Sequence, residues 1–218
     1  MFDVKTLAII GAVALSPVAG SAATVVIDTF DTIQLAIDPT GDGVLDTSTA
    51  PAAEAIGGSR TITASGDGAP FPVSVTAINV GNGIAAVSNS AGVTGTALFE
   101  WNAGNVDLTD GGSNDSILLS VIDVDLDVQF DLTINGVTSS SVAASEAGQI
   151  LFSLGDFGDL SNGAGEISLF VSGPTAFDAQ FDFIGAVSEV PLPAGGLLLG
   201  SILLGGGFAA RRKAKAQS

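Results

Sequence analysis

The sequence predicts an all-β fold, a jelly-roll-like antiparallel β-sandwich, flanked by two membrane-addressing segments. Three observations predict it. Short runs that alternate apolar and polar residues are separated by turn residues, and the 218-residue chain holds 29 glycines. No long stretch with helical periodicity occurs between residues 24 and 188. Five of the six basic residues lie at the two ends, with Arg60 as the exception, whereas every acid except Asp3 lies between residues 24 and 190.

Residues 1–23 have the composition of a secretory signal peptide. Lys5 supplies a positive charge, and the apolar run from Leu7 to Leu15 is short for a membrane span. Small residues around Ala22 suit cleavage. We therefore expect secretion across the inner membrane, with residues 24–188 as the extracellular domain. A retained N-terminal anchor is the alternative.

Within this domain, alternation and turn residues predict a succession of short strands. The expected strands are Thr24–Thr29, Arg60–Ala64, Phe71–Asn79, Ile84–Ser88, Val93–Trp101, Ser116–Ile122, Asp127–Asn135, Val137–Ala143, Gln149–Leu154, Gly165–Ser172 and Phe177–Val187. So many short strands in one domain favour two packed sheets over a single sheet.

Two segments show the strand pattern most clearly. Alternate residues of Val124–Ile134 are apolar and the residues between them are polar, so one set is expected in the core. Asn135 and Gly136 follow, and Asn-Gly is a strong signal for a two-residue hairpin. Alternate residues of Phe177–Phe183 are likewise apolar, which predicts a closing strand with a buried phenylalanine face.

The C-terminal segment, residues 189–218, has three parts. An uncharged, glycine-rich run over residues 194–210 reaches about 25 Å as a helix, enough for a thin hydrocarbon core. A basic cluster follows it and is expected to stay in the cytoplasm. The motif before the run is Val190, Pro191, Leu192, Pro193 and Ala194, and the cluster after it is Arg211, Arg212, Lys213 and Lys215.

This order of motif, apolar span and basic end resembles the VPLPA-CTERM sorting signal of the PEP-CTERM group. The resemblance implies recognition by an exosortase-like membrane transpeptidase, with Pro191 and Pro193 as recognition elements. It also implies anchoring in the inner membrane before processing, and a place at the cell surface or in the extracellular matrix afterwards. An ordinary single-pass anchor is the alternative.

The domain also resembles the secreted β-sandwich domains found ahead of PEP-CTERM signals. The residues that match are Asp28-Thr29-Phe30-Asp31, Gln34, Gly57-Gly58-Ser59-Arg60, Ser88-Asn89-Ser90-Ala91-Gly92, Phe99-Glu100-Trp101-Asn102, Val106-Asp107-Leu108 and Gly111-Gly112. The chain departs from this pattern at Asn102-Ala103, where those domains have Asp-Gly. The resemblance implies location and fold but no activity, although some such domains look like carbohydrate-binding jelly rolls.

Composition excludes several functions. The chain has no Cys, His or Tyr, which rules out disulfides, thiolate nucleophiles, Cys/His zinc sites and His-based triads. Its net charge of −17 argues against nucleic-acid partners. We expect no catalytic residue and no enzymatic activity. A glycoside hydrolase needs two carboxylates across a cleft. The pairing we name for hydrolysis, the third hypothesis, is Glu100 as an acid beside Trp101 as a sugar-stacking platform.

Calcium is the cofactor that the acids suggest. Asp38, Asp42 and Asp46 partly match a calcium-binding loop, and the alternative is an Asp/Gly-rich connection between strands. If the first and last strands pair, Asp28, Asp31 and Asp182 form an alternative calcium site.

Two functions are therefore weighed ahead of hydrolysis. The first is a non-catalytic surface or extracellular-matrix protein processed by an exosortase-like enzyme. The second is a carbohydrate-binding or calcium-dependent adhesive module, with extracellular polysaccharide as partner and Trp101 as the platform on which a sugar stacks.

Overall fold

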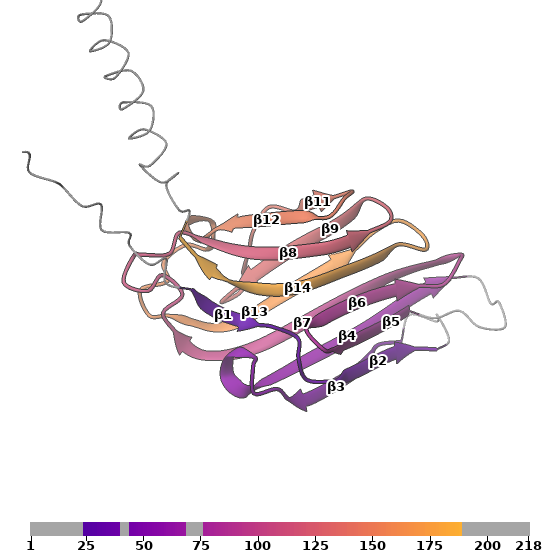
Figure 1. Ribbon diagram of the computed structural model, residues 1–218, viewed down its shortest axis with the longest axis horizontal. Helices are drawn as coiled ribbons and strands as arrows, with labels where there is room; N and C mark the ends of the chain where they lie inside the picture. The colour runs from indigo at the N-terminus through magenta and orange to yellow at the C-terminus, as the bar shows by residue number, and fades with distance from the viewer. Residues whose placement is uncertain (1–23, 40–43, 69–75, 189–218) are drawn as a thin grey trace, which may run out of the picture. The chain divides into compact units, whose positions relative to one another are not determined.

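The computed structural model describes residues 24–39, 44–68 and 76–188. These residues form two antiparallel β-sheets packed face to face (Figure 1). The predicted signal peptide, residues 1–23, and the predicted sorting segment, residues 189–218, lie outside the described residues. Within the described part of the chain, no helix is long and apolar enough to cross a membrane.

The first sheet has the order β12-β8-β14-β6-β5-β2, and β1 pairs with β14 beyond the end of β6. All its pairings are antiparallel. Its strands are β1 (Val25–Asp28), β2 (Gln34–Asp38), β5 (Thr76–Gly81), β6 (Ile84–Asn89), β8 (Ser116–Val124), β12 (Gly148–Ser153) and β14 (Asp178–Val187).

The second sheet has the order β10-β9-β13-β7-β4-β3, and β11 also pairs with β9. Its strands are β3 (Asp46–Pro51), β4 (Ser59–Gly68), β7 (Val93–Val106), β9 (Val128–Ile134), β10 (Val137–Thr138), β11 (Val142–Ala144) and β13 (Ala164–Ser172). Two short 3-10 helices, η1 (Ile56–Gly58) and η2 (Leu154–Phe157), lie in connections. The predicted antiparallel β-sandwich is confirmed. A jelly-roll order of its strands stays a prediction.

The hairpin of β9 and β10 forms as predicted. Val128, Phe130, Leu132 and Ile134 are fully buried between the sheets. Asn135 and Gly136 both have positive φ, 52° and 79°, as a two-residue type I′ turn requires. The predicted alternating segment, Val124–Ile134, begins too early, however, because β9 starts only at Val128. Leu126 is 39% exposed, because β8 ends at Val124 and the chain turns before β9 begins.

The closing strand β14 departs from the predicted alternation at its centre. Phe177 and Phe181 are fully buried, but Phe183 points outward and is half-buried, so this prediction was wrong for Phe183. The pairing of β14 with β8 shifts register between Phe181 and Phe183. A bulge of this kind adds one residue to a strand and reverses the face of every side chain beyond it. Ile184 is consequently fully buried.

Strands β2 and β3 were not predicted. β2 turns two polar residues, Gln34 and Asp38, toward the core, where each has hydrogen-bond partners. β3 is an edge strand of polar residues, and its Thr47 and Thr49 bond across to Thr63 and Thr61 of β4. Neither strand therefore shows apolar alternation.

Candidate functional site

Trp101, the predicted sugar platform, is not on the surface. It is 2% exposed, stacks on Phe99 with ring centroids 6.3 Å apart, and donates from Nε1 to Asp28 Oδ2 at 2.7 Å. The prediction is wrong because β7 alternates: Glu100 faces outward and Trp101 faces the core. A ring buried in this way cannot stack on a ligand.

The carboxylate that Trp101 contacts is fully buried and ion-paired. Arg60 Nη1 lies 2.7 Å from Asp28 Oδ2, and both side chains have no exposed surface. The remaining nitrogens of Arg60 donate to Gln34 Oε1 at 3.0 Å and to the Thr32 carbonyl at 2.9 Å. Oδ1 of Asp28 accepts from the Phe30 amide at 2.7 Å. The pair is thus fully hydrogen-bonded, as buried charges require.

Glu54 caps the edge of this cluster. Its two carboxylate oxygens accept from the amide and the hydroxyl of Thr32, at 2.6 and 2.8 Å, and Oε1 lies 3.8 Å from Arg60 Nη1. Burial raises the pKa of Glu54, but the hydrogen bonds from Thr32 and the Arg60 charge outweigh it and hold the pKa below its usual range. We call Asp28, Gln34, Glu54, Arg60 and Trp101 the buried polar cluster.

Four of the residues that carried the resemblance to secreted β-sandwich domains converge on this cluster. Asp28, Gln34, Arg60 and Trp101 come from four strands and are far apart in the sequence. Their contacts are with one another and with the core. These matching positions therefore hold the two sheets together and do not face a ligand.

The structure does not assemble Asp28, Asp31 and Asp182 into a metal site. β1 and β14 do pair, as that hypothesis required, but Asp28 turns inward to Arg60. Asp31 accepts from Thr29 Oγ1 at 2.9 Å, and Asp182 is exposed on β14. Among the residues described here, no three acids are placed to hold a metal ion.

The predicted calcium loop is described only in part. Asp38 ends β2 and accepts from the Gly66 amide at 2.9 Å, while Asp46 begins β3 and accepts from the Ile37 amide at 2.7 Å. Both carboxylates therefore bond to backbone. Asp42 lies outside the described residues, so calcium binding by this loop stays a prediction.

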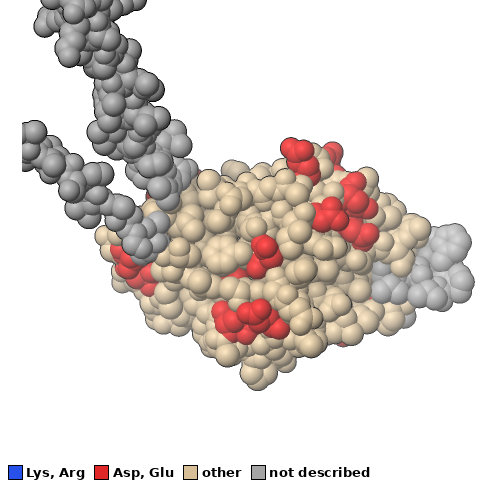
Figure 2. All heavy atoms as spheres, viewed as in Figure 1, with Lys and Arg blue, Asp and Glu red and all other residues tan. Residues whose placement is uncertain are grey.

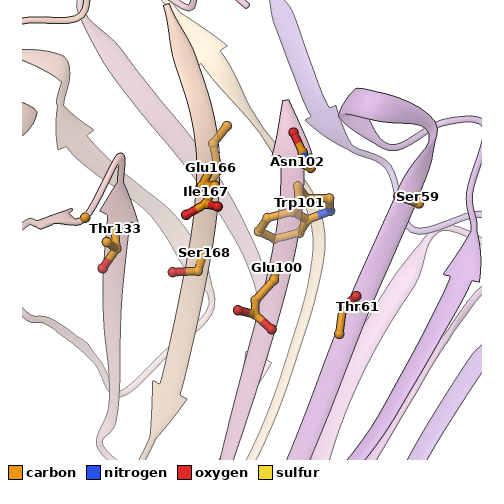
Figure 3. A pocket seen from close by; sticks show the side chains of 10 residues that line it. Ser59, Thr61, Glu100, Trp101, Asn102, Thr133, Glu166, Ile167 and Ser168 are labelled. Atoms are coloured by element: carbon orange, nitrogen blue, oxygen red, sulfur yellow. The ribbon is translucent and has the colours of Figure 1, made fainter. Parts of the chain in front are cut away.

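An open pocket of about 340 Å³ lies on the outer face of the second sheet, where β4, β7, β13 and β9 run side by side (Figure 3). We call it the outer groove. Trp101 and Ile167 form its floor, since their side chains point away into the core. The other lining residues are Ser59, Thr61, Glu100, Asn102, Thr133, Gly136, Glu166 and Ser168.

Strand register brings the polar side chains of the outer groove together. Glu100 pairs with Thr61 on one side and with Ser168 on the other. Asn102 pairs with Glu166, and Ser168 also pairs with Thr133. Paired residues on one face of a sheet lie about 5 Å apart. Hydroxyl, amide and carboxylate groups from four strands therefore face one volume.

An exposed aromatic ring continues the same face. Phe170 lies two residues after Ser168 on β13, about 7 Å along the strand, and is 37% exposed. Leu98 and Asp131 are its neighbours on β7 and β9. Phe170 was not among the site residues predicted from the sequence. It could have been found from alternation, because it stands in line with Glu166 and Ser168, which face outward on the same strand.

Comparison with protein-family models gives no match for the chain, and comparison with curated proteins gives none either. Among solved structures, the chain is similar to the family 11 carbohydrate-binding module of a cellulosomal cellulase of Clostridium thermocellum. The identity is 12% and the TM-score 0.41, over 78% of this chain and 96% of the module.

A variant of a family 29 carbohydrate-binding module complexed with cellulohexaose is also similar. Its identity is 12% and its TM-score 0.40, over 77% of this chain and 92% of that chain. Another family 29 module has 11% identity and a TM-score of 0.39, over 72% of this chain and 90% of that one. At such identities and TM-scores, the likeness by itself assigns no ligand to this protein.

Proposed function

We propose that residues 24–188 form a non-catalytic domain that binds polysaccharide along the outer groove. The observation that supports this function is the grouping of Glu100, Asn102 and Glu166 with the exposed ring of Phe170 on one open sheet face. From the sequence, carbohydrate binding is the alternative to a plain matrix protein, with Trp101 as the ring on which a sugar stacks. In this proposal Phe170 replaces Trp101 as that ring.

The chemistry of the face suits a sugar chain. A sugar ring has an apolar face that packs on an aromatic ring, and hydroxyls at its edge that need donors and acceptors. The polar lining of the outer groove and the exposed ring of Phe170 beside it offer both along β13. Hydrolysis requires two carboxylates that flank the scissile bond, whereas Glu100 and Glu166 are both exposed on the same face of one sheet.

Replacing Phe170 with alanine tests this function. We expect affinity for a bound polysaccharide to fall about tenfold, because losing an aromatic contact costs about 1–1.5 kcal/mol. Affinity electrophoresis of the full chain against a panel of soluble polysaccharides measures it, and release of reducing ends in the same samples tests for hydrolysis.

Phe183→Ala is the matched control, since Phe183 is a half-buried phenylalanine on the outer face of the first sheet. It is expected to leave the affinity unchanged. Equal losses in the two variants, or no retardation of the unmodified chain by any polysaccharide, would count against the proposal.

We further propose that the protein acts outside the cell and is released from its tail by an exosortase-like transpeptidase. The support is the sequence alone, in residues 1–23 and in the motif from Val190 to Ala194. In a host that carries such an enzyme, the exported protein is expected to lack the basic cluster. Replacing Pro191 and Pro193 with alanine should leave the tail attached, as intact mass measures, whereas Pro174→Ala should not. A mature protein that keeps its tail would refute the processing step.

A further inference from the structure

The outer groove contains two carboxylates without a counter-charge. Glu100 and Glu166 stand on adjacent strands and are both exposed. Neither side chain has a hydrogen-bond or ion-pair partner among the described residues. Figure 3 shows Glu100 extending from β7 toward β13, beside Ser168. These acids are thus available to a ligand, unlike Asp28 and Glu54, which have partners within the domain.

No basic side chain of the described domain can neutralise them. Arg60 is its one basic residue, and it is fully buried against Asp28 on the core side of β4. Figure 2 shows one face of the domain with several acidic patches and no Lys or Arg. Such a surface repels an anionic polymer and attracts a cationic one over a range set by salt.

The spacing of the two acids favours a cationic polymer over a single metal ion. Glu166 pairs with Asn102 and Glu100 pairs with Ser168, so the two acids are diagonal neighbours, with backbones about 7–8 Å apart. No third acid joins them within the described residues. Two separate carboxylates, with neutral acceptors between them, can each take a different ammonium group.

We infer that the outer groove selects polysaccharides with free, protonated amino groups, that is, polymers of unacetylated amino sugars. This inference rests on the proposed carbohydrate binding and specifies its ligand class. Glu100 and Glu166 accept hydrogen bonds from the sugar ammonium groups, and Asn102 and Ser168 bond to hydroxyls. Phe170 packs on the apolar face of a neighbouring ring.

The test compares a glucosamine hexamer with an N-acetylglucosamine hexamer, titrated calorimetrically into the full chain. At about pH 6 the sugar amines are protonated, so the free-amine hexamer should bind at least about tenfold more tightly. Raising the pH to about 8.5 should abolish this preference, because the sugar amines lose their charge.

The variant E100Q/E166Q should lose at least about tenfold in affinity for the glucosamine hexamer. D123N/D127N is the matched control: it removes the same charge from two exposed acids near the β8–β9 connection, at the other end of β9 from the outer groove. It should change the affinity less than about twofold.

Four outcomes decide the inference. A tenfold loss confined to E100Q/E166Q supports it. Equal losses in both double variants overturn it, since the attraction is then a general effect of the acidic surface. Equal binding of the two hexamers, unaffected by E100Q/E166Q, overturns it while the proposed carbohydrate binding stands. Binding of neither hexamer, nor of any polysaccharide in the panel, overturns both.

Discussion

Replacing Arg60 with methionine is expected to lower the free energy of unfolding by about 3–5 kcal/mol. The substitution leaves the Asp28 carboxylate fully buried with no compensating charge, and it also removes the donor to Gln34 Oε1. In a domain of this size such a loss lowers the melting temperature by about 10 °C. Thermal and urea unfolding of the full chain, followed by circular dichroism, measure it.

Two comparisons make this result interpretable. Asp67→Asn changes an exposed charge on the same strand β4 and should shift stability by less than about 0.5 kcal/mol. Adding Asp28→Leu to Arg60→Met removes the stranded carboxylate and should recover part of the loss. A loss below about 1 kcal/mol in Arg60→Met alone would contradict a structural role for the buried polar cluster.

Replacing Gly57 with alanine should also destabilise the domain strongly. Gly57 has φ 73°, and a Cβ there would lie 1.7 Å from the carbonyl oxygen of Asn102. That oxygen belongs to the backbone of β7, so it cannot move without shifting the strand. We expect a loss of more than about 3 kcal/mol, with weaker polysaccharide binding because Asn102 lines the outer groove.

Gly58 is the matched control. Its φ is 75°, but a Cβ there would meet nothing within 4 Å. Gly58→Ala should therefore lower the free energy of unfolding only by the backbone cost of a left-handed residue, about 1–2 kcal/mol. It should leave polysaccharide binding unchanged. The difference in melting temperature between the two variants isolates the close approach to Asn102. If both variants melt at the same temperature, that contact is not tight in solution.

Strand positions were predictable wherever a strand had one apolar face. β9 and β13 alternate regularly, both lie where strands were expected, and β9 has the expected set of residues buried. The prediction failed at Leu126 because the chain crosses there from β8 of the first sheet to β9 of the second, and at Phe183 because a bulge shifts the register of β14. Both features interrupt alternation without changing the residue pattern. It missed β2 because Gln34 and Asp38 are buried polar residues whose partners lie on distant strands.

The candidate site was less predictable than the fold. Strand alternation predicts that Glu100 and Trp101 face opposite sides of the sheet, but it does not predict which of the two side chains faces water. The packing of the second sheet against the first decides that question, because it buries Trp101. The pairing of β7 with β13 sets Glu100 beside Ser168, and Phe170 on the same outer face is exposed, so Phe170 is the proposed platform in place of Trp101.

The β-class, most strand positions, the strongly acidic composition and the absence of Cys and His chemistry can be read from the residues, because they depend on composition and on a two-residue period. Which side chains meet depends on the arrangement of the strands in space. Asp28, Arg60 and Trp101 converge between the sheets, and Glu100 and Glu166 share the outer groove. Local pattern assigns a residue to a face, whereas its neighbours on that face depend on strand order and register, which long-range packing sets.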